Sequence, residues 1–188
     1  MDLVDFHRQA LAATGRRIAA VGDDRWDQPT PCDDWDVRAV VNHIVAGNWW
    51  ATELAAGATI EAVGDRFDGD LLGTDPVAAY RESADLADEV FRRPGALEAM
   101  CAVSYGPVPG EVYLGHRCTD VLIHGWDVAA AIGGDTQLES ELVEACWAVV
   151  EPQAHLLAAS GAFATDVDAP LDADLQTRLL TTLGRRPR

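Results

Sequence analysis

The chain has 188 residues, of which 48% are hydrophobic, and its formal net charge at pH 7 is −17. This length suits a single domain, residues 1–188, with a substantial core, and the hydrophobic fraction excludes a disordered chain. The acidic balance argues against nucleic acid or an anionic membrane as a partner, because both would repel the protein.

The cysteines and the N-terminal residues indicate the compartment. Charges run throughout Met1–Val21, which is not typical of a signal peptide, and no apolar run approaches the length of a membrane span. Four cysteines are widely separated and form no CxxC pair, which argues against a zinc ribbon or a thioredoxin-type site. These are Cys32, Cys101, Cys118 and Cys146. We therefore expect a cytoplasmic protein with reduced thiols.

A first helix is predicted over Asp2–Val21, where apolar residues recur at three- and four-residue steps. His7 falls on this apolar stripe, and we interpret it as a satisfied core histidine without an assigned role. Pro29 and Pro31 then make Gly22–Asp34 a loop.

A second helix is predicted within Pro31–Gly57, with Asp33 or Asp34 as its cap. Its core-facing residues recur at helical spacing: Val37, Val40, Ile44, Ala51 and Leu54. His43 lies at the margin of this stripe, where the simplest interpretation is a border histidine that hydrogen-bonds a neighbour. Gly47, one turn later, should leave open space beside the imidazole.

The middle of the chain combines a long connection with a third helix. Ala58–Thr74 is predicted to be a surface loop of unusual length, and it could be either an ordered cover over a site or disordered. Asp75–Arg93 is predicted as a helix, with Asp75 as its cap and Pro76 at its first position. Met100–Tyr105 is predicted as a short strand or an extended connection.

The segment Gly110–Ile132 is predicted as a helix that carries His116, Asp120 and His124 at four-residue spacing, with Asp127 continuing the line. Residues four apart lie on one face of a helix, and a carboxylate and an imidazole at i and i+4 can chelate one metal ion. The outer histidines lie about 12 Å apart along the axis, at 1.5 Å per residue, so at most one neighbouring pair serves one ion. A third ligand must come from elsewhere. The alternative is a polar stripe that faces water.

The C-terminal part is also predicted to be helical. Glu139–Ser160 has a helical pattern, and Pro152 predicts a kink or break within it. A short terminal helix is predicted over Ala173–Leu183, followed by a loose basic tail, Arg185–Arg188. The nearly all-helical pattern with short turns favours a helical bundle.

Two segments together resemble a known family. The sequence PTPCDDWDVRAVVNHIVAGN, followed about seventy residues later by RCTDVLIHGWDVAAAIG, resembles the mycothiol-dependent maleylpyruvate isomerase metal-binding domain. That domain belongs to the DinB/YfiT-like superfamily, and the likeness is closest to an uncharacterised actinobacterial branch. It covers nearly the whole chain. The resemblance implies an all-α fold, a DinB-like up-down four-helix bundle with additional short helices.

The resemblance also implies a divalent metal, usually zinc, although nickel, manganese or iron fit similar ligand sets. Carried over by position, the ligands are His43, Asp120 and His124, and Asp127 could orient one of them. Three protein ligands with one open position taken by water form the zinc pattern typical of catalytic sites. In related proteins the ion coordinates a low-molecular-weight thiol, which for actinobacteria implies mycothiol.

The chain departs from the isomerase in two respects. Asp120 stands where the isomerase has the longer Glu, so the metal must lie nearer the helix. The chain also ends where the isomerase continues into a second domain that helps to bind substrate, which argues against maleylpyruvate itself as the substrate.

The favoured function is a metal- and thiol-dependent transferase or isomerase. A metal-bound thiolate would add to a small-molecule electrophile, giving S-conjugation or cis–trans isomerisation. Arg117 and Tyr113 could hold a carboxylate or donate a proton, although a surface charge and a packed aromatic are the simpler interpretations. We interpret His116 as the solvated end of the stripe and Cys118 as a small core residue.

Two other functions remain open. One is a non-catalytic module that binds metal or nothing and acts as a sensor or a dimerising partner, for example in a homodimer. The other is a hydrolase. No GxSxG segment is present, so a hydrolase would require a zinc-bound water.

Overall fold

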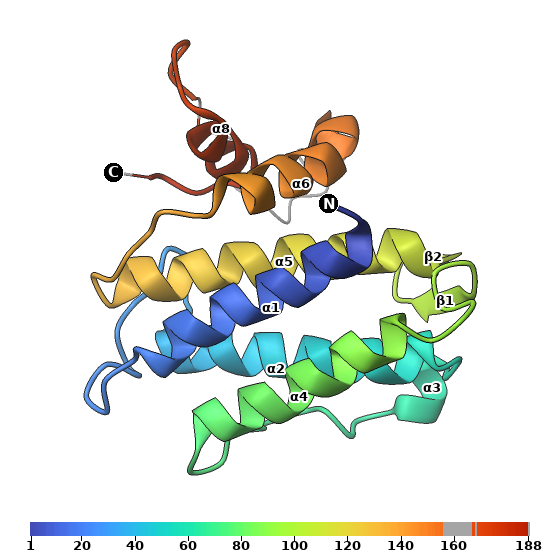
Figure 1. Ribbon diagram of the computed structural model, residues 1–188. Coiled ribbons are helices and arrows are strands. Elements are labelled where there is room, and N and C mark those ends of the chain that lie inside the picture. The colour runs from blue at the N-terminus through green and yellow to red at the C-terminus, as the bar shows by residue number, and fades with distance from the viewer. Residues whose placement is uncertain (156–166, 168, 188) are drawn as a thin grey trace.

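The structure, a computed structural model, describes residues 1–155, 167 and 169–187. Its body consists of four long helices packed side by side (Figure 1). These are α1 (Leu3–Ala19), α2 (Val37–Ala55), α4 (Pro76–Phe91) and α5 (Gly110–Ala131). Both α1 and α2 pack against α4 and α5, so the four helices enclose one core. The expected all-α class is confirmed.

The directions of these helices follow from the connections between them. Helices α1 and α5 run one way, and α2 and α4 run the other way (Figure 1). The connection from α2 to α4 contains the short helix α3 (Ile60–Val63) and returns along the bundle, which makes α2 and α4 parallel. Helix α5 is therefore antiparallel to α2, so the first half of α2 lies opposite the second half of α5.

Smaller elements flank this body. Strands β1 (Met100–Val103) and β2 (Gly106–Pro109) form an antiparallel hairpin that leads directly into α5. Helices α6 (Ser140–Val150) and α8 (Leu175–Thr182) pack against each other, and α6 covers α1 and α5 (Figure 1). A 3₁₀ turn, η1 (Glu151–Gln153), follows α6 directly. The predicted break at Pro152 is thus confirmed. The last part of the helix predicted over Glu139–Ser160, residues 156–160, lies outside the described residues.

Acidic side chains cap α1, α2, α4 and α8. The carboxylate of Asp75 accepts from Ala78 N at 3.0 Å at the start of α4, as predicted. The cap of α2 is Asp36, which accepts from Ala39 N at 2.8 Å, so the prediction of Asp33 or Asp34 was wrong. The physical reason is the preceding loop: Asp34 has a left-handed φ of 65°, and Asp36 still pairs with Pro29 in an extended bridge, so the helix begins only after it.

The long connection between α2 and α4 packs against α2. Val63 and Leu72 are buried, which anchors it at two points. Arg38 of α2 forms an ion pair of 2.8 Å with Asp70, and Asn42 Oδ1 accepts from Leu71 N at 2.8 Å. The five core-facing residues predicted on α2 are all buried, so that prediction is confirmed. Among the described residues, no helix combines the length and apolarity needed to cross a membrane.

Candidate metal centre

Three donor side chains converge between α2 and α5. Asp120 Oδ1 lies 3.1 Å from His43 Nε2 and 3.4 Å from His124 Nε2. The donor atoms of the three residues all lie within 4.8 Å of one another. The antiparallel packing of α2 and α5 produces this convergence, because it places His43 opposite the i, i+4 pair on α5.

The spacing of these donors suits a small divalent ion. Bonds of about 2.0–2.2 Å to zinc place neighbouring tetrahedral ligands about 3.3 Å apart. The two distances from Asp120 Oδ1, 3.1 and 3.4 Å, bracket that value. Two imidazoles and one carboxylate are also ligands that zinc accepts. The residues present therefore fit the metal implied by the sequence.

The donors are open to solvent on one side. The exposed fraction of the side chain is 38% for His43, 27% for Asp120 and 11% for His124. The indole of Trp35 lies beside both imidazoles, with ring centroids 4.9 Å from His43 and 5.9 Å from His124. The cluster thus has one apolar wall and one accessible side through which a small molecule can reach it.

Arg117 is buried beside the donors, so its interpretation as a surface charge was wrong. Its Nη1 donates to Asp120 Oδ2 at 2.7 Å, and its Nη2 donates to Asn48 Oδ1 at 3.1 Å. The guanidinium fills the space next to Gly47, where a Cβ would overlap Nη1. The space predicted to be open beside His43 is therefore occupied by an arginine. Because this arginine bonds Oδ2 of Asp120, Oδ1 is left to face the two histidines.

The charges around Asp120 keep it ionised. Burial alone would raise the pKa of Asp120, but the charges of Arg117 and His124 and hydrogen bonds from both histidines hold this pKa well below its usual range. Burial would lower the pKa of His124, but the charge of Asp120 and hydrogen bonds to Asp120 and Asp127 raise it well above its usual range. A metal at this site must therefore displace a proton from His124.

Asp127 holds the other nitrogen of His124. Its Oδ2 lies 3.0 Å from His124 Nδ1, and the carboxylate is fully buried. Arg185 donates to both carboxylate oxygens, from Nε to Oδ1 at 3.2 Å and from Nη2 to Oδ2 at 2.7 Å. Arg185 is only 8% exposed, so the prediction of a loose tail was wrong at this residue. The tail is anchored because its guanidinium is the counterion of a buried carboxylate.

Cys32 joins His124, Asp127 and Arg185 in a second cluster, and the sequence analysis assigned it no role there. Its Sγ lies 3.2 Å from Asp127 Oδ2, 3.6 Å from His124 Nδ1 and 3.1 Å from Arg185 Nη2. Cys32, His124 and Asp127 thus form a second group with metal-binding spacing. No spacing rule links these residues, because the loop before α2 and the C-terminal tail meet α5 only in the folded chain.

Comparison with known proteins now gives the family. The family model of the mycothiol maleylpyruvate isomerase N-terminal domain matches residues 7–129. The chain belongs to this family. The matched range contains His43, Asp120, His124 and Asp127 but ends before Arg185.

Two relatives and two solved structures are also similar to this chain. Two uncharacterized proteins of Mycobacterium tuberculosis, from strains CDC 1551 and H37Rv, are each 36% identical over 197 residues, covering 100% of this chain and 100% of each relative. A mutant of the mycothiol-dependent maleylpyruvate isomerase has a similar fold, with a TM-score of 0.68, 14% identity, and coverage of 88% of this chain and 75% of that chain. A second structure of that isomerase gives a TM-score of 0.62 at 16% identity, covering 87% of this chain and 70% of that chain. The expected DinB-like fold is confirmed.

Other residues singled out in the sequence lie outside the donor cluster of this family member. His116 bonds Tyr105 Oη at 2.6 Å and Gln153 Oε1 at 3.3 Å, at the hairpin end of α5. Tyr113 and Cys118 are buried, as predicted. None of these residues is therefore among the donors.

His7 is buried but is not the satisfied core histidine that was predicted. Among the residues that the structure describes, neither ring nitrogen has a hydrogen-bond partner. Its ring meets Phe91 edge-on, with centroids 5.5 Å apart. Burial, with a smaller contribution from the charge of Arg117, lowers the pKa of His7 to about 3. His7 is therefore a neutral core residue.

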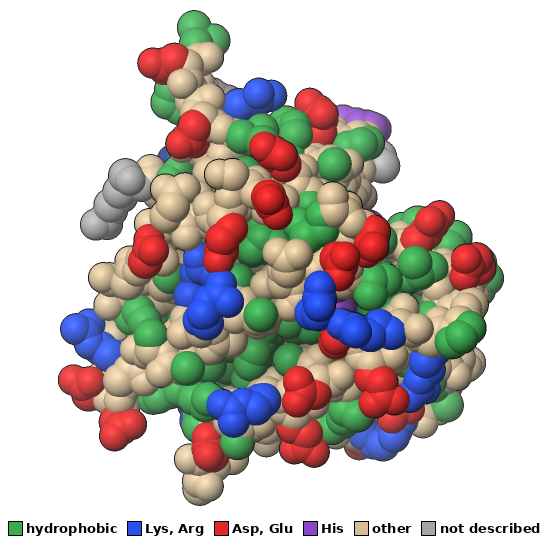
Figure 2. Space-filling model, viewed as in Figure 1, with side chains coloured by type: hydrophobic (Ala, Val, Ile, Leu, Met, Phe, Trp, Pro, Cys, Tyr) green, Lys and Arg blue, Asp and Glu red, His purple; other side chains and the backbone are tan. Residues whose placement is uncertain are grey.

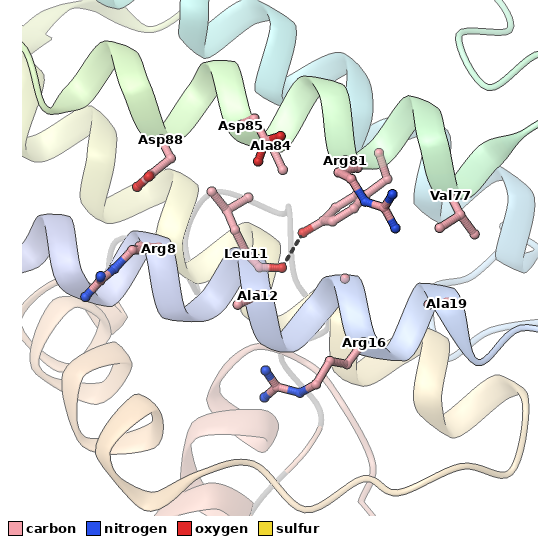
Figure 3. A pocket seen from close by; sticks show the side chains of 12 residues that line it. Arg8, Leu11, Ala12, Arg16, Ala19, Val77, Arg81, Ala84, Asp85 and Asp88 are labelled. Carbon is pink, nitrogen blue, oxygen red and sulfur yellow. Dashed lines mark hydrogen bonds between the residues drawn. The ribbon is translucent and has the colours of Figure 1, made fainter.

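A cavity of about 430 Å³ lies on the opposite side of the bundle, between α1 and α4. Figure 3 shows its apolar residues, among them Leu11 and Val77, with Arg81 and Asp88 at the sides. The hydroxyl of Tyr80 donates to Leu11 O at 2.8 Å and closes part of it. On this face acidic and basic side chains are interspersed around exposed apolar atoms (Figure 2). None of the residues that line the cavity is a donor of the candidate metal centre.

Proposed function

We propose that this protein binds a divalent metal, most simply zinc, through His43, Asp120 and His124, and that the metal activates a low-molecular-weight thiol. The thiol is mycothiol, by analogy with the family, and the reaction is S-transfer to, or isomerisation of, a small-molecule electrophile. One observation carries this proposal: two imidazole nitrogens and a carboxylate oxygen converge at spacings that suit one ion.

The donor set leaves room for a thiol. Three protein ligands leave a fourth tetrahedral position, and the exposed side of His43 gives access to it. When bound, zinc would supply Lewis acidity that deprotonates a coordinated thiol. The protein's own contribution is to position that thiol and to keep the surroundings of the donors apolar on the side of Trp35.

The neighbouring residues prepare the donors for a cation. Asp127 accepts a hydrogen bond from the protonated Nδ1 of His124, which leaves the lone pair of a neutral imidazole on Nε2, the nitrogen that faces Asp120. Arg117 binds Asp120 Oδ2 and so directs Oδ1 to the two histidines. Each ligand is therefore held in the orientation that metal binding needs.

The first experiment is elemental analysis of protein purified without a metal-affinity tag. We expect about one metal per chain, in keeping with a single three-ligand site, and its loss in His43→Ala and in His124→Ala. His155→Ala replaces an exposed histidine outside the cluster and should retain the metal. Metal retained in both ligand variants contradicts the assignment. Titration calorimetry with mycothiol should then show binding to the loaded protein and none to the metal-free protein.

A second candidate is a metal-binding module without catalytic activity, acting as a sensor or in a homodimer. The burial of Arg117 favours it, because the guanidinium is engaged by Asp120 and Asn48 and is not available to hold a substrate carboxylate. This candidate predicts metal at the site but no binding of the thiol. The same calorimetric titration therefore separates the two functions.

A further inference from the structure

Two potential donor sets share one histidine. His43, Asp120 and Nε2 of His124 form the first set, and Cys32, Asp127 and Nδ1 of His124 form the second. A neutral imidazole has one lone pair, so a metal bound through one ring nitrogen requires a proton on the other. The two sets are therefore mutually exclusive for a neutral His124.

An arginine is bound to the carboxylate of each set, but in different ways. Arg117 bonds one oxygen of Asp120, Oδ2, and leaves Oδ1 facing the two histidines. Arg185 bonds both oxygens of Asp127 and also donates to Cys32 Sγ at 3.1 Å. The first set thus keeps its donor atoms free, and in the second set a guanidinium already contacts the carboxylate and the sulfur.

We infer that Arg185 is a specificity-determining residue that occupies the cation position of the second donor set and thereby directs metal to the first. This inference rests on the proposed function, because it assumes that the first set is the one intended for metal. Arg185 bonds a buried carboxylate in the bidentate manner that makes arginine a strong partner for such groups. A metal that entered the second set would have to displace this guanidinium from its buried carboxylate.

Without Arg185, the second set would be the better one for a thiophilic ion. It offers a sulfur, an imidazole nitrogen and a carboxylate oxygen, and thiolate is a preferred ligand of zinc and cobalt. Binding there would release the proton of the Cys32 thiol to solvent and form the metal–sulfur bond. Arg185 therefore keeps the metal away from the chain's own thiol and at the side open to an external one.

Cobalt(II) titration of the full chain tests this inference, because cobalt bound to thiolate gives an intense near-ultraviolet charge-transfer band and cobalt bound to imidazole and carboxylate does not. We expect the parent to bind about one cobalt without this band. Arg185→Gln should also bind about one, because the sets share His124, but with the band present. The double variant Arg185→Gln/Cys32→Ser should lose it. Arg186→Gln removes the same charge from the neighbouring, exposed residue and should behave as the parent does.

Two results overturn the inference: a thiolate band in the parent, or a folded Arg185→Gln protein that binds cobalt without one. If Arg185→Gln does not fold, as judged by circular dichroism, Arg185→Met keeps the aliphatic stem and is read in the same way. Failure of the proposed function looks different. A parent that binds no cobalt, with the band in Arg185→Gln, contradicts the proposed metal site but still supports the occupation of the second set by Arg185.

Discussion

Two buried histidines in this protein have opposite surroundings. His7 on α1 is fully buried, and within the described part of the chain neither of its nitrogens has a hydrogen-bond partner. His124 on α5 is 9% exposed, and its two nitrogens face Asp120 and Asp127. The pKa of His7 is lowered to about 3, whereas that of His124 is raised well above its usual range.

The contrast shows that neighbouring charges, rather than burial, decide what a buried histidine can do here. Burial lowers the pKa of both rings. Helix α5 offsets this at His124 because it carries one carboxylate four residues before the ring and another three residues after it. At His7 the second contribution comes from Arg117, and its charge lowers the pKa further. One histidine is therefore a neutral packing residue, and the other is stabilised in its charged form by the two carboxylates beside it.

Neutralising Asp127 should have the largest effect on this contrast. Asp127→Asn keeps the shape of the side chain but removes the buried negative charge that Arg185 bonds through both oxygens, and it weakens the acceptor of His124 Nδ1. Breaking a buried pair in this way costs about 3–5 kcal/mol, which chemical denaturation should measure. Asp135→Asn, at an exposed position, is the control and should change little. The double variant Asp127→Asn/Arg185→Gln should recover part of the loss, and a strictly additive result would contradict the pairing.

A methyl group at Gly47 should weaken metal binding at the candidate metal centre, because it displaces Arg117. In Gly47→Ala the new Cβ overlaps the guanidinium, which must move away from Asp120. We expect metal affinity about 10–100-fold weaker, because a group that orients a ligand is disturbed. Stability should also fall, because the buried guanidinium loses its bond to Asp120, and the gain of up to about 1 kcal/mol of alanine over glycine within a helix offsets only part of that loss. Gly115→Ala on α5 is the matched control, because its Cβ would meet the methyl groups of Val149, at 3.2 Å and beyond, and no group that contacts the donors. Unchanged affinity in Gly47→Ala would show that Arg117 does not position Asp120.

His7 predicts a dependence of stability on pH. Its pKa is 6.5 in its ordinary state and about 3 in the fold, so the unfolded chain takes up a proton first as the pH falls. Folding stability is therefore lost as the pH drops from about 6.5 toward 3, at up to about 1.4 kcal/mol per pH unit.

Replacing the ring should remove this loss. In His7→Leu the decrease in unfolding free energy between pH 6.5 and pH 5 should be about 1.5 kcal/mol smaller than in the parent. His155→Leu, at an exposed position, should leave the pH profile unchanged. Parallel profiles for the parent and His7→Leu would mean that folding does not lower the pKa of His7.

Local pattern was enough to predict the long helices and two of the three candidate ligands, but not the short helix α3, which lies within the predicted loop Ala58–Thr74. Apolar spacing identified the buried residues of α2, and four-residue spacing placed Asp120 and His124 on one face of α5. The partnership with His43 was not available from spacing, because it depends on how α2 and α5 pack. It came from the resemblance to a family, and the structure brings the three side chains together.

The two arginines show why the rest could not be predicted. Arg117 and Arg185 look like surface charges in the sequence, and a long cationic side chain is usually exposed. Their burial depends on contacts made by distant segments: Gly47 makes room for one guanidinium, and Asp127 neutralises the other. Pattern rules describe one helix at a time. They allow the i, i+3 pair of Arg117 and Asp120, but they cannot show that Gly47 on α2 makes room for it or that Asp127 is the counterion of Arg185.

The smallest effect is expected at the third histidine of the α5 stripe. His116 lies two helical turns before His124, about 12 Å along the axis, and is bonded to Tyr105 and Gln153 instead of the donors. His116→Ala should therefore retain the metal content of the parent and change the unfolding free energy by no more than about 0.5 kcal/mol. Elemental analysis and denaturation of this variant should be run beside His124→Ala. Loss of metal in His116→Ala would place the ion one turn earlier on α5 and would remove the contrast between His124 and the other histidines.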